Sequence, residues 1–388
     1  MSGAGGFDFD AVRERRGTDS EKWARWAGRD VLPLWVADMD FPAPPPVVAA
    51  LGERVAHGVF GYALPDASHA RALRDALARD CGWSVEPEWL VWLPGLVSGL
   101  TVACRAVGQE GDGVLAMPPV YGPFLRVPGY AGRELRRAPL AGDNRAGWRL
   151  DPAALAPATD ARTRLLLLCH PHNPVGRAWR RGELEGLAAF AARHDLVVCS
   201  DEIHSELLLE PGRPHVPFAT LSPDAAARTI TLLAPSKTYN LPGLGCAVAV
   251  ISDPALRARF QRAMAGIVPH VNALGLLAAR VAWTEGAPWR AALLDCLRAN
   301  RDFLAGHVAA LPGVTMAPVE ATYLAWLDVR EWGLDDPHAH ALAHGLGLSD
   351  GRDFGAPGWL RLNFGCPRAT LAAACDRLAA AASAAAGG

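Results

Sequence analysis

The chain has 388 residues, of which 51% are hydrophobic and 20% charged, and its formal net charge is −2 at pH 7. This length allows a large core and two domains, and the composition is that of a soluble globular protein. A net charge this small argues against binding to nucleic acid or to a membrane surface.

Cysteine usage and the leading residues indicate the compartment. The eight cysteines include no C-x-x-C pair, and several lie in apolar runs, as buried thiols in a reducing environment do. Residues 2–10 carry Gly and Asp where a signal peptide would have a basic start and an apolar run, and no apolar run approaches the ~20 residues of a membrane span. We therefore expect a cytoplasmic protein.

The first part of the chain predicts an extended arm followed by two helices. Residues 32–41 form an apolar stretch that is closed by four prolines, and they are expected to be extended and packed on a core. Residues 47–58 and 71–81 have the spacing of helices, with a turn at residues 60–62 between them.

From residue 89 onward, strands and helices alternate. Strands are expected at residues 89–93, 113–117, 164–169, 196–200, 229–233 and 246–251, and helices at 97–107, 121–131 and 180–194. This alternation predicts a largely parallel sheet with helices on both faces and right-handed crossovers. In such a sheet, ligands bind beyond the carboxyl ends of the strands.

The pattern changes after residue 252. Helices are expected at residues 254–266, 272–285, 288–311, 337–345 and 370–386, and strands at 321–328 and 359–364. We therefore predict an α/β fold with a mostly parallel, doubly wound sheet in a large domain over 47–284. A smaller α+β domain covers 285–388, and an N-terminal arm over 1–46 joins it.

The residues just past the strands carry most of the chemistry. They are Pro94-Gly95, Pro118 to Tyr121, His170 to Pro174, Asp201 to His204, and Ser236-Lys237. Lys237 lies in a turn between two buried runs, with Pro and Gly fixing the turn. Such a lysine can form a Schiff base, although on its own a solvated loop lysine would be the favoured interpretation.

Two of these loops could bind charged parts of a ligand. Free N–H groups after Gly95, with Ser98, would hold a phosphate, although an ordinary strand-to-helix turn explains Gly95 as well. Asp201 ends a buried strand and needs a cationic partner. That partner could be a protonated pyridine nitrogen or an Arg or Lys side chain.

The other loops could bind a flat ring. Asn173 and His204 could hydrogen-bond a phenolic oxygen, and Tyr121 could stack on the ring. With an imine on Lys237, a phosphate and a pyridinium partner, these features together describe pyridoxal 5′-phosphate (PLP).

Motifs along nearly the whole chain carry a resemblance to a known family. They are LPLWVADMDF at 32–41, PPVYGPF at 118–124, CHPHNPVGR at 169–177, SDEIHSEL at 200–207, APSKTYNLPGL at 234–244, ATYLAWLD at 321–328 and RLNFGCPR at 361–368. The chain resembles the PLP-dependent fold-type I aminotransferase superfamily. Within it, the chain is similar to the cystathionine β-lyase or C–S lyase (MalY/PatB-like) branch.

The resemblance implies roles for the cofactor-binding residues. Lys237 would be the catalytic Schiff-base lysine, and Asp201 would be the partner of the pyridinium. The remaining cofactor contacts would be Asn173 and His204 at the ring oxygen, Tyr121 on the ring, and Leu96, Val97 and Ser236 at the phosphate.

The resemblance also implies a substrate site and a partner. Arg361 would bind the substrate α-carboxylate through its planar fork, helped by Asn173 and by the backbone near Ala37. The alternative for Arg361 is a salt bridge on a domain face. Tyr62 would reach the phosphate of the neighbouring subunit, so we expect a homodimer with shared active sites.

Three positions depart from ordinary aminotransferases. His204 replaces a tyrosine three residues after the aspartate, Ala234 replaces a serine three before the lysine, and Gly245 replaces an arginine eight after it. All three fit the lyase branch, and they leave the phosphate site with less side-chain charge.

The function implied by the resemblance is a PLP-dependent C–S β-lyase. It would cleave L-cystathionine or related S-substituted cysteines to pyruvate, ammonia and a thiol. One alternative is a class I/II aminotransferase, and another is a regulatory protein that keeps the fold. Intact Lys237, Asp201 and Arg361 disfavour a purely regulatory role.

One further signal is a group of histidines near the C-terminus. His340 and His344 have the i, i+4 spacing of zinc ligands on a helix, and His338 lies close by. No Glu stands between them in a metalloprotease arrangement. We therefore expect exposed helix histidines and no metal.

Overall fold

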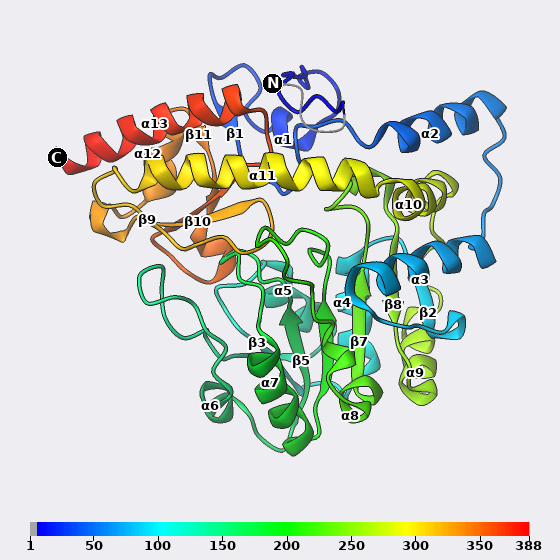
Figure 1. Cartoon of the computed structure of the whole chain (residues 1–388). Coiled ribbons are helices and arrows are strands. Elements are labelled where there is room, and N and C mark those ends of the chain that lie inside the picture. The colour runs from blue at the N-terminus through cyan, green and yellow to red at the C-terminus, as the bar shows by residue number, and fades with distance from the viewer. Residues whose placement is uncertain (1–5, 388) are drawn as a thin grey trace.

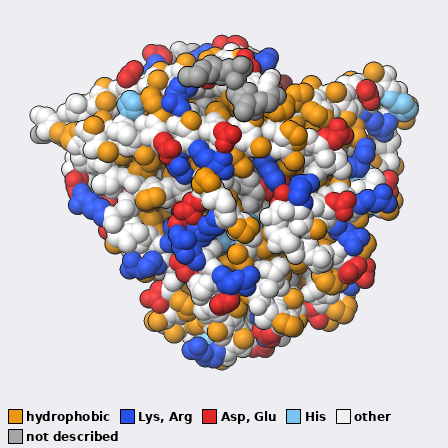
Figure 2. Space-filling view, viewed as in Figure 1, with side chains coloured by type: hydrophobic (Ala, Val, Ile, Leu, Met, Phe, Trp, Pro, Cys, Tyr) orange, Lys and Arg blue, Asp and Glu red, His pale blue; other side chains and the backbone are white. Residues whose placement is uncertain are grey.

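The computed structural model describes residues 6–387, so the first five residues of the predicted arm lie outside it. The large sheet and its covering helices fill the lower part of Figure 1, and the long helix α11 (Ala287–Val308) runs across above them. The N-terminal arm lies at the top beside the C-terminal helix α13 (Arg368–Ala386). Charges of both signs are interspersed over this face (Figure 2), consistent with the small net charge.

The large sheet has seven strands in the order β2-β8-β7-β6-β5-β3-β4. They are β2 (Leu90–Leu93), β3 (Gly113–Ala116), β4 (Glu134–Arg137), β5 (Thr163–Cys169), β6 (Val197–Asp201), β7 (Thr229–Leu233) and β8 (Ala247–Val250). All neighbours are parallel except β8, which is antiparallel to both β7 and β2. The connection from β7 to β8 contains no crossover helix, so the two strands run in opposite directions. The predicted α/β class is confirmed.

The sheet is buried on both faces, as its apolar strands predict. In β5, Leu165 and Leu167 pack into the core on one face, and Leu166 and Leu168 pack into the core on the other. The first core is completed by helices α4 (Leu96–Ala106), α5 (Pro123–Tyr130) and α9 (Pro254–Met264). The second is completed by α7 (Arg181–Arg193) and α8 (Pro223–Ala227). Helices α2 (Pro45–His57) and α3 (Ala67–Cys81) pack on α10 (Ala273–Glu285).

The second sheet is antiparallel, with the order β12-β13-β10-β9. Its strands are β9 (Thr315–Met316), β10 (Leu324–Asp328), β12 (Ser349–Asp350) and β13 (Trp359–Asn363). Helices α11, α12 (Pro337–Ala343) and α13 accompany it. The N-terminal arm joins this part through a parallel pair, β1 (Leu32–Pro33) with β11 (Leu346–Gly347). The exact domain boundaries remain a prediction.

The local differences from prediction have simple causes. The helix expected from residue 121 begins at Pro123, which leaves Tyr121 in a loop after Pro118-Pro119. The strand expected from residue 321 begins at Leu324, because Thr322 has a φ of 74°. Between residues 6 and 387, no helix is both long and apolar enough to cross a membrane.

Candidate active site

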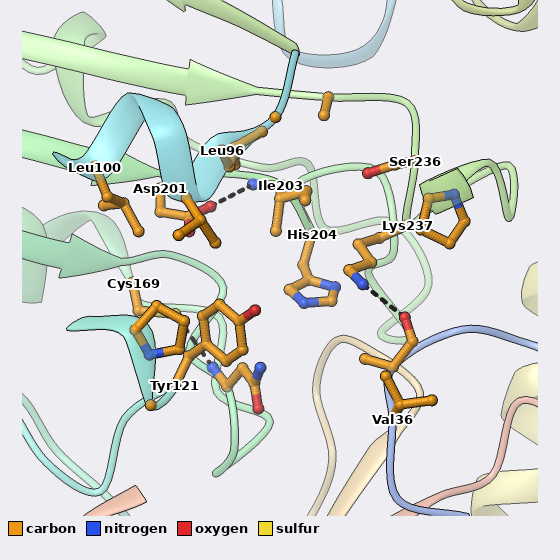
Figure 3. A pocket seen from close by; sticks show the side chains of 18 of the residues that line it. Val36, Leu96, Leu100, Tyr121, Cys169, Asp201, Ile203, His204, Ser236 and Lys237 are labelled. Atoms are coloured by element: carbon orange, nitrogen blue, oxygen red, sulfur yellow. Dashed lines mark hydrogen bonds between the residues drawn. The ribbon is translucent and has the colours of Figure 1, made fainter. Parts of the chain in front are cut away.

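The predicted site residues other than Tyr62 meet in one cavity of about 750 Å³ at the carboxyl ends of the central strands. Figure 3 shows the side chains that project into it from the loops after β3, β6 and β7, from the start of α4 and from the N-terminal arm. The lining includes Ala37, Leu96, Val97, Tyr121, Asn173, Asp201, His204, Ser236, Lys237 and Arg361. Segments that are distant in the sequence thus form a single site.

Lys237 lies on the turn after β7 and points into the cavity (Figure 3). Its Nζ donates a hydrogen bond of 2.6 Å to the carbonyl oxygen of Ala37. Burial, with a smaller contribution from the charge of Arg361, lowers the pKa of Lys237 to about 8. A sizeable fraction of neutral amine is therefore present near physiological pH, as a nucleophile or general base requires.

Asp201 ends β6, and its side chain is 4% exposed. Its carboxylate accepts a 3.2 Å hydrogen bond from the N–H of Ile203 and forms no ion pair with residues 6–387. Burial raises the pKa of Asp201 to about 7, and the neighbouring charge of Glu202 adds to the shift. This aspartate is therefore a buried acid that faces the cavity without a cation.

His204 and Asn173 line the same cavity as Asp201, Lys237 and Arg361. Burial, followed by the charges of Lys237 and Arg361, lowers the pKa of His204 to about 3, so its imidazole is neutral. Its Nδ1 is buried and has no hydrogen-bond partner in the described part of the chain. Asn173 accepts a 3.0 Å hydrogen bond from Nη1 of Arg361, which leaves its side-chain N–H groups free. Both residues can therefore contact a ring oxygen.

Another part of the cavity lining fits a phosphate. The first N–H groups of α4, at Leu96 and Val97, have no partner within the helix. The hydroxyl of Ser236 lines the same cavity and makes no hydrogen bond within residues 6–387. Gly245 has a φ of 52°, and a Cβ there would lie 2.9 Å from the carbonyl oxygen of Pro94. A side chain at this position would be strained, which accounts for the missing arginine.

Arg361 projects from β13 and is 5% exposed. Its Nη2 donates to the carbonyl oxygen of Trp35 at 2.7 Å and to Oγ of Ser349 at 3.2 Å. No carboxylate of residues 6–387 pairs with it, and its buried Nε has no acceptor. The salt bridge that was the alternative for Arg361 is thus not formed, and the guanidinium can take an incoming carboxylate.

Prediction from sequence missed the residues that hold the arm in place. Tyr323 donates from its hydroxyl to the carbonyl oxygen of Ala37 at 2.9 Å, and Ser349 donates to that of Trp35 at 2.6 Å. Tyr323 lies inside one of the family motifs, which was the available signal. Ser349 lies in a two-residue strand that has no periodicity to reveal it.

Tyr62 and the histidines lie away from the cavity. Tyr62 is fully exposed, with a relative accessibility of 107%. His338, His340 and His344 are half-buried, and each contacts a backbone carbonyl oxygen. The expectation of exposed histidines was wrong, because α12 packs against α13 and each of the three side chains is partly covered.

The chemistry of the cavity fits PLP, the cofactor expected from sequence. Asp201 faces the cavity without a cation and the pyridinium would supply one, while a ring oxygen could be the partner that the buried Nδ1 of His204 does not have among the described residues. Tyr121 offers a ring for stacking, and the start of α4 offers N–H donors for a phosphate.

Comparison with known proteins agrees with this chemistry. A sequence model described as "Aminotransferase class I and II" matches residues 29–378. Cystathionine beta-lyase PatB of Bacillus subtilis (strain 168) is 38% identical over 386 residues, which cover 96% of this chain and 99% of the relative.

Solved structures are similar over the same range. The crystal structure of OvoB is 48% identical, with a TM-score of 0.95, and the match covers 97% of this chain and 99% of that one. The PLP-bound C-S lyase from Staphylococcus hominis is 27% identical, with a TM-score of 0.91, and the match covers 98% of this chain and 100% of that one.

Proposed function

The chain belongs to the class I and II aminotransferase family, and we propose that it is a PLP-dependent C–S β-lyase. It cleaves L-cystathionine or related S-substituted cysteines to pyruvate, ammonia and a thiol. The observation that carries the proposal is that one cavity contains both a buried Asp201 with no cationic partner and a Lys237 whose pKa is lowered. The names of the relatives, a cystathionine beta-lyase and a C-S lyase, support the reaction type.

The protein groups divide the work of binding the cofactor. PLP, when bound, withdraws electrons from the substrate Cα and so makes the proton there acidic. Asp201 holds the charge on the pyridine nitrogen that this requires, and Asn173 and His204 hold the ring oxygen. Leu96, Val97 and Ser236 bind the phosphate, and Tyr121 covers the ring.

Two residues act on the substrate. Arg361 binds its α-carboxylate in bidentate fashion, helped by Asn173 and by the Ala37 backbone, and so fixes the direction of the Cα–H bond. Lys237 Nζ, which also attaches the cofactor, lies on the same side of the cavity as Ala37 and takes the α-proton as general base. Loss of the thiolate from Cβ, which takes up a proton to become the thiol, then completes the elimination, and water hydrolyses the released enamine to pyruvate and ammonia.

Product analysis tests the reaction type. With L-cystathionine, the holoenzyme should form pyruvate, ammonia and homocysteine in equal amounts without an added keto acid. An aminotransferase using the same lysine and ring would instead require a keto acid and would leave the sulfur on its product. That outcome would refute the lyase assignment in favour of the alternative.

We also propose a cytoplasmic homodimer in which Tyr62 reaches the phosphate of the partner. Tyr62 lies in an irregular segment with other exposed apolar side chains, Val59, Phe60 and Leu64. A second copy of the chain would cover this segment. Mixing the inactive variants Tyr62→Phe and Lys237→Ala should restore part of the activity, because one site of each mixed dimer is then intact. An active monomer in sedimentation would contradict this proposal.

A further inference from the structure

The rim of the cavity carries three charged side chains beyond the residues assigned above. Glu21 of α1 (Glu21–Ala24), Arg126 of α5, and Asp353 of the 3-10 segment Gly351–Phe354 line the cavity and are exposed. None of the three makes a side-chain hydrogen bond or ion pair within residues 6–387. The neighbouring Arg352, by contrast, pairs with Asp336 and Asp350.

Arg126 is folded back toward the site over Gly122. A Cβ added to Gly122 would lie 3.0 Å from Nη1 of Arg126 and 2.8 Å from the carbonyl oxygen of Asp353. Gly122 has a φ of −50°, which any residue adopts, so the glycine is needed for space. Because Gly122 has no side chain, the guanidinium of Arg126 and the carbonyl oxygen of Asp353 can both lie close to this position, which is next to Tyr121 in the chain.

The electrostatics place the same two residues near the substrate groups. Burial raises the pKa of Tyr121, and the positive charges of Arg361 and Arg126 both oppose this shift. Burial lowers the pKa of Arg361 to about 10, and the charge of Asp353 is among those that oppose the shift. Arg126 and Asp353 thus act on the residues that would hold the ring and the α-carboxylate.

We infer that this rim selects among S-substituted cysteines by the charges at the distal end of the S-substituent, with Arg126 and Asp353 as the specificity-determining residues. Arg126 takes a distal carboxylate through the planar fork, and Asp353 accepts from a distal ammonium, while Glu21 adds negative charge at the rim. A neutral alkyl substituent would leave both charges without a partner as it displaced their water. The inference rests on the proposed lyase function and assigns the residues that set its preference among S-substituted cysteines.

Four conjugates of equal reach separate the two distal charges. L-cystathionine carries both charges, S-(3-carboxypropyl)-L-cysteine only the carboxylate, S-(3-aminopropyl)-L-cysteine only the ammonium, and S-propyl-L-cysteine neither. Pyruvate formation by the PLP-loaded dimer gives kcat and KM for each conjugate. Absorbance changes of the bound cofactor give a second, binding readout.

The expected pattern follows the charges. Arg126→Gln should lower kcat/KM for the two carboxylate-bearing conjugates about tenfold more than for S-propyl-L-cysteine, chiefly through KM. Asp353→Asn should lower kcat/KM several-fold more for the two conjugates that carry the distal ammonium than for the two that lack it. Arg105→Gln, at an exposed arginine of α4 that does not line the cavity, should leave these ratios unchanged.

Each other outcome overturns a stated claim. If Arg126→Gln lowers kcat/KM equally for all four conjugates, or for none of them, Arg126 does not bind the distal carboxylate. If the unaltered enzyme prefers S-propyl-L-cysteine, the rim does not select for the distal charges. If no conjugate yields pyruvate, the lyase function fails, and the affinities from cofactor absorbance still decide whether the rim distinguishes the four.

Discussion

The chain contains only two lysines, and they lie in two clusters of buried charge that differ in how the charges are satisfied. Lys22 belongs to a cluster in the N-terminal arm, and Lys237 to the cavity. Both clusters use the same short segment: Lys237 donates to the carbonyl oxygen of Ala37, and Lys22 to that of Asp38, the next residue.

In the arm cluster, opposite charges meet. Nζ of Lys22 lies 2.7 Å from Oδ2 of Asp40, and Nη1 of Arg15 lies 2.7 Å from Oδ1 of the same carboxylate. Arg15 also pairs with Asp38 at 2.6 Å. Burial alone would raise the pKa of Asp40, but the charge of Lys22 and hydrogen bonds from Lys22, Trp23 and Arg15 bring it below its usual value.

In the cavity, charges of both signs are present and unpaired. Asp201, Lys237 and Arg361 form no ion pair with one another or with other described residues. The pKa of Asp201 is accordingly raised and those of Lys237 and Arg361 are lowered, and each shift favours the neutral form of the group. The arm shows that this chain can satisfy buried charges fully, so unpaired buried charges in the cavity are evidence of a functional site.

The sharpest test of the comparison replaces the cavity lysine. Lys237→Ala should lower lyase activity at least about 10⁴-fold, because it removes both the cofactor attachment and the general base. Lys237→Arg, the control, keeps the charge but cannot release its proton, so it should be equally inactive. Borohydride reduction followed by peptide mapping should label Lys237 and leave the buried Lys22 unmodified. A label on Lys22 would contradict the assignment of Lys237 as the lysine that binds the cofactor.

The second test concerns stability without the cofactor. The folded protein keeps the Asp201 proton up to about pH 7, whereas an unfolded aspartate releases it near pH 3.8. Because the folded state binds more protons in this window, its stability should fall as the pH rises from about 4 to about 7. Asp201→Asn should remove this loss and stabilise the cofactor-free protein by up to about 4 kcal/mol above pH 7.

Denaturant unfolding of the two cofactor-free proteins at several pH values measures this difference. With PLP bound, the sign should reverse, since the carboxylate then has a cation and its loss leaves the pyridine nitrogen without a partner. If Asp201→Asn destabilised the cofactor-free protein at pH 7.5, the acid would be satisfied by protein groups and the contrast with Asp40 would disappear.

The cavity residues could be predicted from the sequence more readily than the arm cluster, for physical reasons. The cavity residues follow buried strands, and β-sheet geometry brings strand ends to one edge, so Asn173, Asp201 and Lys237 could be placed together in advance. The arm cluster depends on side chains that reach backbone carbonyls across an irregular segment, and no periodicity marks such contacts. The short strand β4 was missed for a related reason, since its half-exposed ELRR has no apolar alternation.

The last and smallest effect belongs to the arm. Lys22→Met should reduce the free energy of unfolding by about 3 kcal/mol, because Asp40 loses its closest buried partner while Arg15 and Trp23 remain. Since the pKa of Asp40 lies below its usual value, this loss should be complete above about pH 4 and should shrink only in stronger acid, opposite to the slope expected for Asp201. Lys22→Arg, which keeps the charge, is the matched control. Below its melting temperature, Lys22→Met should retain lyase activity to within tenfold. A loss as large as that of Lys237→Ala, in a protein of unchanged stability, would instead place Lys22 in the catalytic site.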